Sequence, residues 1–246
     1  MSELIAFVAG ATGATGRELV SAMLSDPRYK QVIATSRSPA IAPENFPGLP
    51  EDADRSKLKV LAGIDDFRSL DASALSGAQV VITAMGTSRA NAEVIADRDA
   101  LGADEGFVKW LKLVDVDYNA HLAKLAASSG ALVFGRVSAR AANSQQEGGG
   151  FNLYMKHQGI ADEVILAMQT AFPKGVIILR PGRLERGDEL RSKRSWEVEA
   201  HGRDGPGLHV GAVAERMLRE VDKALASDGS AATVVAHEDI VREARM

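Results

Sequence analysis

The feature that most constrains this chain is a glycine-rich turn close to its first residue. Gly10-Ala-Thr-Gly13-Ala-Thr-Gly16 follows the apolar run 4–8 directly and leads into an amphipathic segment, 16–25. A strand, a tight turn and a helix start present bare backbone N–H groups and the positive end of the helix dipole to an anion. The spacing is G-x-x-G-x-x-G, not the G-x-G-x-x-G of the commonest dinucleotide fingerprint. In this context it predicts a dinucleotide-binding turn made of Gly10, Thr12, Gly13, Ala14, Thr15 and Gly16.

The remainder of the chain alternates short apolar runs with longer helical patterns, which is typical of a parallel sheet covered by helices on both faces. We therefore expect an α/β fold, a Rossmann-type doubly wound parallel sheet of about seven strands, as a single NAD(P)-binding domain over 1–246. Residues 183–210 carry many charges and few apolar side chains, so they form either a solvated excursion or a flap over a substrate. The expected strands are 4–8, 31–36, 58–62, 79–84, 131–137, 176–179 and 232–236, and the expected helices are 16–25, 117–128, 153–171 and 211–226.

Composition narrows the function classes. A net charge of −4 argues against a nucleic-acid partner, because binding a phosphate backbone needs a basic surface. The chain has no cysteine, which excludes disulfides and thiolate chemistry, and its five histidines are scattered without metal-ligand spacing. No apolar run approaches the ~20 residues of a membrane helix, and no signal-peptide pattern precedes the first strand. From these absences we expect a cytoplasmic protein with no metal, membrane or nucleic-acid partner.

The end of the second expected strand predicts which dinucleotide binds. In dinucleotide folds a carboxylate there bonds the ribose 2′-hydroxyl of NAD, whereas an arginine accommodates the 2′-phosphate of NADP. The strand here ends in Ser36-Arg37-Ser38 with no carboxylate, and Arg17 follows the glycine turn. A planar guanidinium can bind a phosphate bidentately. The sequence thus favours NADP(H) over NAD(H), with Ser36 and Arg37 near the 2′-phosphate.

Two further strand ends are expected to touch the cofactor. Asp65 follows the third strand, where such folds contact adenine. The fourth strand ends in Met85-Gly86-Thr87, a small-residue turn that lets a cofactor pack against backbone at the carboxyl edge of the sheet.

Several motifs in order resemble a known family, the atypical short-chain dehydrogenase/reductases, and within it the Tat-interacting-protein oxidoreductase group and its bacterial relatives. The resemblance extends from about residue 4 to about residue 190. It implies a Rossmann-type sheet, NADPH binding with Pro181 at the cofactor, and two long helices that pack across a dyad in a homodimer. Its motifs are Gly10–Arg17, Met85–Arg89, Gly102–Val108, Val116–Tyr118 and Leu179–Gly182.

The resemblance also implies a catalytic set, and this chain departs from it. Family chemistry uses a serine after the fifth strand and Tyr-x-x-x-Lys on the next helix, where the lysine charge lowers the tyrosine pKa. Ser138 and Tyr154 match the serine and the tyrosine, but Gln158 occupies the lysine position. His157 shares the tyrosine's helix face and could relay a proton, and Gln158 could bond a ribose hydroxyl.

Two functions follow from this departure. The first is an NADP-dependent oxidoreductase acting on a small carbonyl or alcohol, with Ser138, Tyr154, His157 and Gln158 as its catalytic residues. The alternative is a non-catalytic NADPH-binding sensor or regulatory protein whose active site is degenerate at Gln158. An epimerase or dehydratase of sugar nucleotides is disfavoured, because the C-terminal part is short for a substrate domain.

Overall fold

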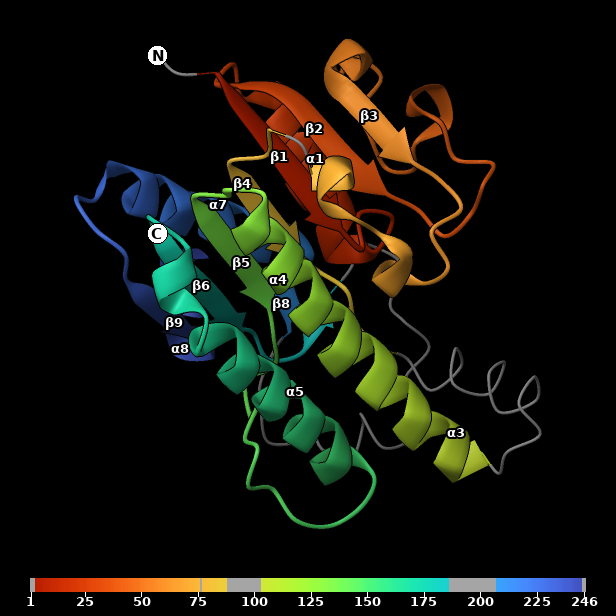
Figure 1. Cartoon of the computed structure of the whole chain (residues 1–246), viewed down its shortest axis with the longest axis vertical. Coiled ribbons are helices and arrows are strands. Elements are labelled where there is room, and N and C mark those ends of the chain that lie inside the picture. The colour runs from red at the N-terminus through yellow and green to blue at the C-terminus, as the bar shows by residue number, and fades with distance from the viewer. Residues whose placement is uncertain (1–2, 76, 88–102, 186–206, 245–246) are drawn as a thin grey trace.

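The alternating apolar runs form one parallel sheet with helices on both faces (Figure 1). The structure is a computed structural model and describes residues 3–75, 77–87, 103–185 and 207–244. Seven parallel strands pair in the order β3-β2-β1-β4-β5-β6-β9. The expected seven-stranded Rossmann-type sheet is confirmed. The strands are β1 (Leu4–Ala9), β2 (Tyr29–Thr35), β3 (Leu58–Leu61), β4 (Val80–Thr83), β5 (Val133–Val137), β6 (Gly175–Arg180) and β9 (Ala232–Ala236).

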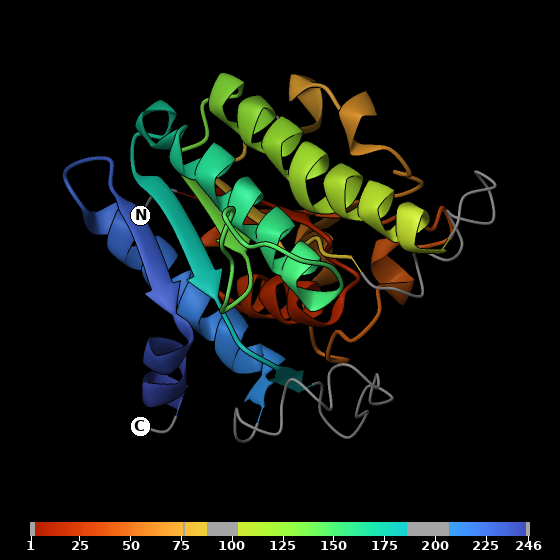
Figure 2. The ribbon, with the colours of Figure 1, turned by 90° about the horizontal axis from the view of Figure 1, so that it is seen from below.

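Helices cover the sheet in two layers (Figure 2). One layer holds α1 (Ala14–Ser25) and α7 (Val210–Ala226), which pack on each other. The other layer holds α5 (Phe151–Leu166) beside one long helix, made of α3 (Ala103–Trp110), a π-helical segment (Leu111–Tyr118) and α4 (Asn119–Ser128). A last helix, α8 (His237–Ala244), follows β9. Short 3₁₀ turns occupy Pro43–Asn45, Arg55–Lys57, Phe67–Ser69, Ala72–Leu75 and Gln169–Ala171.

The inner strands β1, β4, β5 and β6 bury both of their faces, which is why they appear in the sequence as apolar runs without polar alternation. On β1, Val8 belongs to the core beneath α1 and α7, with Leu19 and Met217. Its neighbour Phe7 belongs to the opposite core, with Phe134 and the helices α4 and α5. Two separate hydrophobic cores therefore pack against the two faces of the sheet and fix the positions of its strands.

The structure departs from the expected helices at three points. The helix expected at 117–128 begins at Ala103, and the one expected at 153–171 ends at Leu166. Helix α8 was not expected. Of the expected flap, only the two ends are described. They pair as the short strands β7 (Leu184–Glu185) and β8 (Leu208–His209), while 186–206 lie outside the described residues.

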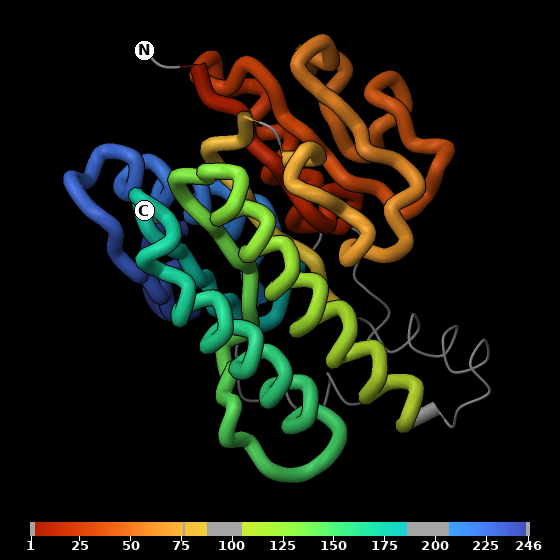
Figure 3. Tube along the Cα trace, viewed as in Figure 1, coloured from red at the N-terminus to blue at the C-terminus, as the bar shows by residue number. Residues whose placement is uncertain are grey.

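The sheet reverses its winding between β1 and β4. Strands β2 and β3 extend to one side of β1, and β4, β5, β6 and β9 extend to the other. Figure 3 shows the two halves of the chain side by side, the first half in red to yellow and the second in green to blue. In open parallel sheets, ligands bind outside the carboxyl ends of the strands at such a switch point. The turns that follow β1 and β4 are therefore the first place to look for a site.

Candidate functional site

The turn after β1 lies against the end of β4, and glycine permits the contact. Gly10 adopts φ +71°, and a Cβ built on it would lie 2.8 Å from the carbonyl carbon of Ala84 and from the Met85 nitrogen. A Cβ on Gly16 would lie 2.1 Å from the Gly10 carbonyl oxygen. Both positions need glycine for the fold itself. Gly10 thus brings the turn after β1 against the end of β4, and Gly16 lets α1 start close to that turn.

Gly13 has a different environment. It caps α1 without a side-chain hydrogen bond, is exposed, and has only the Gly10 carbonyl oxygen, at 3.2 Å, near the place of a Cβ. The amides of Ala14, Thr15 and Gly16 in the first turn of α1 have no partner within the helix. Thr12 is half-buried beside them. The predicted turn residues thus surround a helix start that is open to an anion.

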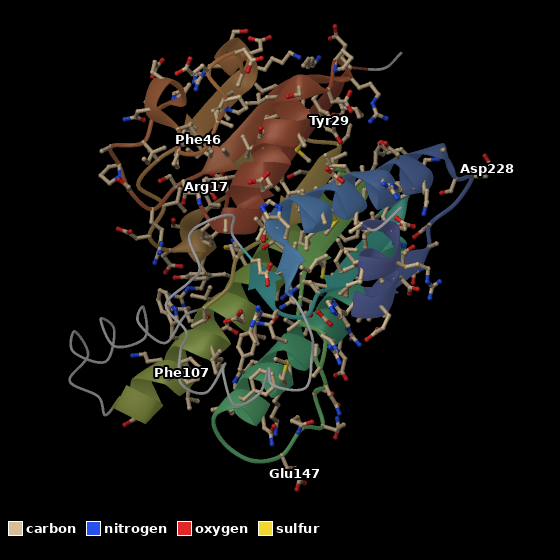
Figure 4. All side chains as sticks on the ribbon, turned by 180° about the vertical axis from the view of Figure 1, so that it is seen from behind. Arg17, Tyr29, Phe46, Phe107, Glu147 and Asp228 are labelled. Carbon is tan, nitrogen blue, oxygen red and sulfur yellow. The ribbon has the colours of Figure 1, made fainter. Side chains whose placement is uncertain are left out.

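The carboxyl end of β2 gathers the residues predicted to select the cofactor. Ser36 is buried, and its carbonyl accepts a hydrogen bond from Ile64 N at 3.0 Å, which places the predicted adenine residue Asp65 at the same edge. Arg37 is exposed and makes no ion pair or hydrogen bond with any residue that the structure describes. Arg17 packs beside the following loop, since a Cβ on Gly48 would lie 2.9 Å from its Cδ (Figure 4). Arg37 thus begins the segment that follows β2, and Arg17 lies against a later part of that segment.

The turn after β4 is hydrogen-bonded to a buried residue of the long helix. Met85 is buried, and Gly86 is exposed with no heavy atom within 4 Å of a built Cβ. The Thr87 hydroxyl donates a hydrogen bond to the carboxylate of Asp115, which is fully buried in the π-helical segment. Burial raises the pKa of the Asp115 carboxyl, and the hydrogen bond from Thr87 and the Arg136 charge oppose that shift. The predicted turn is thus tied to a residue that the sequence analysis did not single out.

Asn119 supports the π-helical segment. Its side-chain amide donates to the carbonyls of Val114, at 2.9 Å, and Asp115, at 3.2 Å. Its side-chain oxygen accepts from the Thr83 hydroxyl at 2.7 Å. A π-helical turn leaves backbone carbonyls without their usual partners, and single π-helical turns frequently occur at functional sites. Here the asparagine supplies the missing donors and ties this helix to β4.

Gln158, at the family's lysine position, is internal to the protein. It is 2% exposed; its Nε2 donates to Asp115 Oδ1 at 2.6 Å, and its Oε1 accepts from Arg136 Nη2 at 2.6 Å. Arg136 is also buried and forms an ion pair with the buried carboxylate of Asp162. Gln158 therefore bridges a carboxyl group and a guanidinium, and its predicted bond to a ribose hydroxyl stays a prediction.

Ser138 lies at the expected end of β5, but its hydroxyl already donates a hydrogen bond within the protein. Its hydroxyl donates to Asp162 Oδ2 at 2.9 Å, and Arg180 Nε donates to the same oxygen at 2.9 Å. Asp162 is completely buried and contacts the two guanidiniums of Arg136 and Arg180. Such a carboxylate accepts hydrogen bonds, so the Ser138 oxygen keeps its lone pairs for a ligand.

The remaining predicted catalytic residues lie at the start of α5. Tyr154 is half-buried, shares a helix face with Gln158, and its ring lies 6.4 Å from that of Phe151, centroid to centroid. His157 Nδ1 lies 2.8 Å from the Leu153 carbonyl oxygen, so this nitrogen donates within its own helix. Pro181 is buried directly after β6, and its carbonyl accepts from Arg140 N at 2.9 Å. The structure thus brings Ser138, Gln158 and Pro181 to one edge of the sheet but leaves their roles as predictions.

Three residues of this site were missed by the sequence analysis: Asp115, Arg136 and Asp162. All three are charged residues within apolar runs or on the buried face of a helix. That pattern is itself a signal, because charged side chains are almost never fully buried unless they are paired. In the described parts of the chain no cluster of three metal-ligating side chains occurs, and none of the helices there has the length and apolarity to cross a membrane.

The fold and the site define a class of protein, the dinucleotide-binding Rossmann proteins. The family model described as NAD(P)H-binding matches residues 10–224, and the chain belongs to this family. Solved structures of similar fold include MoeE5 in complex with UDP-glucuronic acid and NAD, with a TM-score of 0.62 and 17% identity over 94% of this chain and 76% of that one. Another is the oxidoreductase ylbE from Lactococcus lactis, with a TM-score of 0.57 and 15% identity over 99% and 98% of the two chains.

Curated relatives are found among yeasts. The protein FMP52-1, mitochondrial, of Scheffersomyces stipitis is 30% identical over 179 residues, 73% of this chain. The protein FMP52, mitochondrial, of Candida albicans is 31% identical over 181 residues, 72% of this chain. The matched region spans 66% of the length of each relative.

These relatives overturn the expected location. We predicted a cytoplasmic protein, and this is wrong by the comparison, because the matching relatives are named as mitochondrial proteins. The prediction rested on the absence of a signal peptide and of an apolar span. Neither absence specifies a compartment.

Proposed function

We propose that this chain binds NADP(H) at the switch point between β1 and β4 and transfers hydride between the nicotinamide and a small carbonyl or alcohol. The observation that carries the proposal is the close approach of Gly10 to Ala84 and Met85, which leaves the first turn of α1 open beside the β4 turn. Membership of the NAD(P)H-binding family supports it. The amides of Ala14, Thr15 and Gly16 would hold the pyrophosphate.

The preference for NADP over NAD rests on charge at the end of β2. No carboxylate occupies the end of this strand, and Arg37 extends from it without a protein partner among the described residues. Arg17 lies against Gly48, in the loop that follows this strand. A 2′-phosphate carries two negative charges that such guanidiniums can bind bidentately, whereas a plain ribose hydroxyl gains little from them.

In the proposed reaction the bound cofactor supplies or accepts the hydride. Tyr154 would exchange the proton with the substrate oxygen, and the Ser138 oxygen, whose hydrogen is bonded to Asp162, would accept a hydrogen bond from the substrate. The lysine charge that promotes tyrosine ionisation in related enzymes is absent at position 158. We therefore expect slower proton transfer from Tyr154 than in enzymes with the full set.

One observation favours a second function. Gln158 has no charge, and both polar atoms of its amide are bonded inside the protein, the nitrogen to Asp115 and the oxygen to Arg136. A site built in this way can hold NADPH without turning it over. The alternative is therefore an NADPH-binding sensor or regulatory protein.

Isothermal titration tests the cofactor assignment. We expect NADPH to bind more tightly than NADH and Arg37→Glu to reverse that order. Arg242→Glu, the same change of charge on exposed α8, should leave both affinities unchanged. Equal affinities for the two cofactors in the unmodified protein would remove the NADP assignment.

Turnover separates the two functions. NADPH oxidation is followed by absorbance with a panel of small aldehydes and ketones, for the parent protein and for Tyr154→Phe. An oxidoreductase should lose turnover in Tyr154→Phe while keeping its NADPH affinity. Tight NADPH binding with no oxidation by any acceptor would favour the sensor instead.

A further inference from the structure

Ser138 and Arg180 lie side by side at the carboxyl edge of the sheet. Val137 of β5 pairs with Leu179 of β6, and Ser138 N donates to the Leu179 carbonyl at 2.7 Å. Both side chains lie on the sheet face covered by α5, where they meet the same oxygen of Asp162. The serine and the arginine thus form one unit with a shared anchor.

Arg180 differs from the other guanidinium on this anchor. Arg136 is 1% exposed and is bonded to both Asp162 and Gln158. Arg180 is 28% exposed, and only its Nε is bonded, to Asp162. Its two terminal nitrogens have no partner among the described residues and are not buried. Asp162 therefore fixes the arginine by one edge and leaves its outer pair of nitrogens facing solvent.

The charges at this edge favour an anion. One carboxylate, Asp162, serves two guanidiniums. The next carboxyl group, Asp115, is hydrogen-bonded to the cluster through Gln158, and burial raises its pKa, which opposes a second negative charge. Glu238 pairs instead with Arg140, at 3.6 Å. Among the described residues, Asp162 is thus the one carboxylate in direct contact with the two guanidiniums of Arg136 and Arg180, which leaves one positive charge of the pair without a contacting carboxylate.

We propose that Arg180 binds the carboxylate of the substrate, and that the substrate class of the proposed oxidoreductase is small hydroxy acids and their oxo acids. This inference rests on the proposed function, since it places the substrate beside the cofactor. The outer nitrogens of Arg180 match the two oxygens of a carboxylate. The Ser138 hydroxyl donates its hydrogen bond to Asp162, and its oxygen accepts a hydrogen bond from the substrate hydroxyl. Asp162 is a positioning residue for both.

The experiment measures binding of lactate and its neutral counterpart lactamide to the protein saturated with NADP⁺, by NMR or calorimetric titration at constant ionic strength. Lactate should bind more tightly than lactamide. Arg180→Gln should weaken lactate binding by about tenfold or more, the effect expected for a charge-assisted pair, and leave lactamide binding unchanged. Arg180→Lys should recover part of the loss.

Arg140→Gln is the matched control, because it removes another arginine from the same edge and should leave lactate binding unchanged. Thermal melting and NADPH titration of Arg180→Gln show that the fold and the cofactor site persist; Arg136 and Ser138 still hold Asp162 in this variant. If NADPH fails to bind the parent protein, the proposed function falls. If NADPH binds but lactate and lactamide bind alike, or inorganic phosphate competes as well as lactate does, the substrate assignment is overturned.

Discussion

The bridge formed by Gln158 gives a quantitative prediction about stability. Gln158→Leu keeps the approximate size of the side chain but removes one donor and one acceptor. It leaves Arg136 Nη2 and Asp115 Oδ1 without these partners, in a region where both residues are at most 1% exposed. Neither group can turn to water instead.

The expected loss follows from the two orphaned groups. Leaving a buried polar group without its partner costs about 1–3 kcal/mol, so the two together cost about 2–6 kcal/mol in the free energy of unfolding. In a chain of this size 1 kcal/mol shifts Tm by about 2–4 °C. A loss of about 3 kcal/mol would therefore lower Tm by about 6–12 °C.

Urea unfolding followed by circular dichroism, together with a thermal melt, measures this loss. His157→Leu is the matched control, because this neighbour on α5 is half-buried and its ring bonds only its own helix. We expect it to change the free energy of unfolding by less than about 1 kcal/mol. The reasoning is refuted if Gln158→Leu is as stable as the control, since Gln158 would then be free to turn toward the cofactor.

Two further predictions concern the glycine turn and the buried carboxyl group. Gly13→Ala should weaken NADPH binding with little effect on stability. Gly16→Ala should lower the free energy of unfolding, because its Cβ would lie 2.1 Å from a backbone oxygen. NADPH titrations and thermal melts of the two variants in parallel check this. The folded-state pKa of Asp115 lies above its ordinary 3.8, so its stabilisation is complete below that pH and is lost as pH rises through the folded-state pKa. Asp115→Asn should therefore lose less stability than the parent as pH rises above about 4, as measured by urea unfolding; an identical pH dependence would contradict the shift.

Much of the fold could be predicted from sequence because the inner strands bury both faces. Runs such as Val80–Thr83 and Gly175–Arg180 stand out against the polar segments around them. Element ends were less accurate. The helix expected to begin at residue 117 begins at Ala103, because the π-helical segment shifts the periodicity of its apolar positions and hides the continuity of the helix.

The sequence predicted the turns and strand ends of the site but not its buried charged residues. Glycines, Arg37 and the strand-end turns have local signatures, but Arg136 meets Asp162 across 26 positions and Asp115 meets Gln158 across 43. Such contacts depend on how α5 and the long helix pack on the sheet. Gly159 illustrates the same limit, since a Cβ there would lie 2.2 Å from Ser144 N in the preceding loop. Spacing along one chain carries no sign of these approaches.

The glutamine at position 158 is best understood together with Arg136. A residue at this place must donate to Asp115 and accept from the guanidinium, and an amide does both. A lysine has no acceptor and would bring a second cation within hydrogen-bond distance of Arg136, where like charges about 4 Å apart repel by about 4 kcal/mol at an effective dielectric constant near 20. In this chain the arginine on β5 therefore disfavours a lysine at position 158. Gln158 is thus a requirement of the buried network that Arg136 completes, and restoring a lysine at position 158 would restore chemistry only if Arg136 were replaced as well.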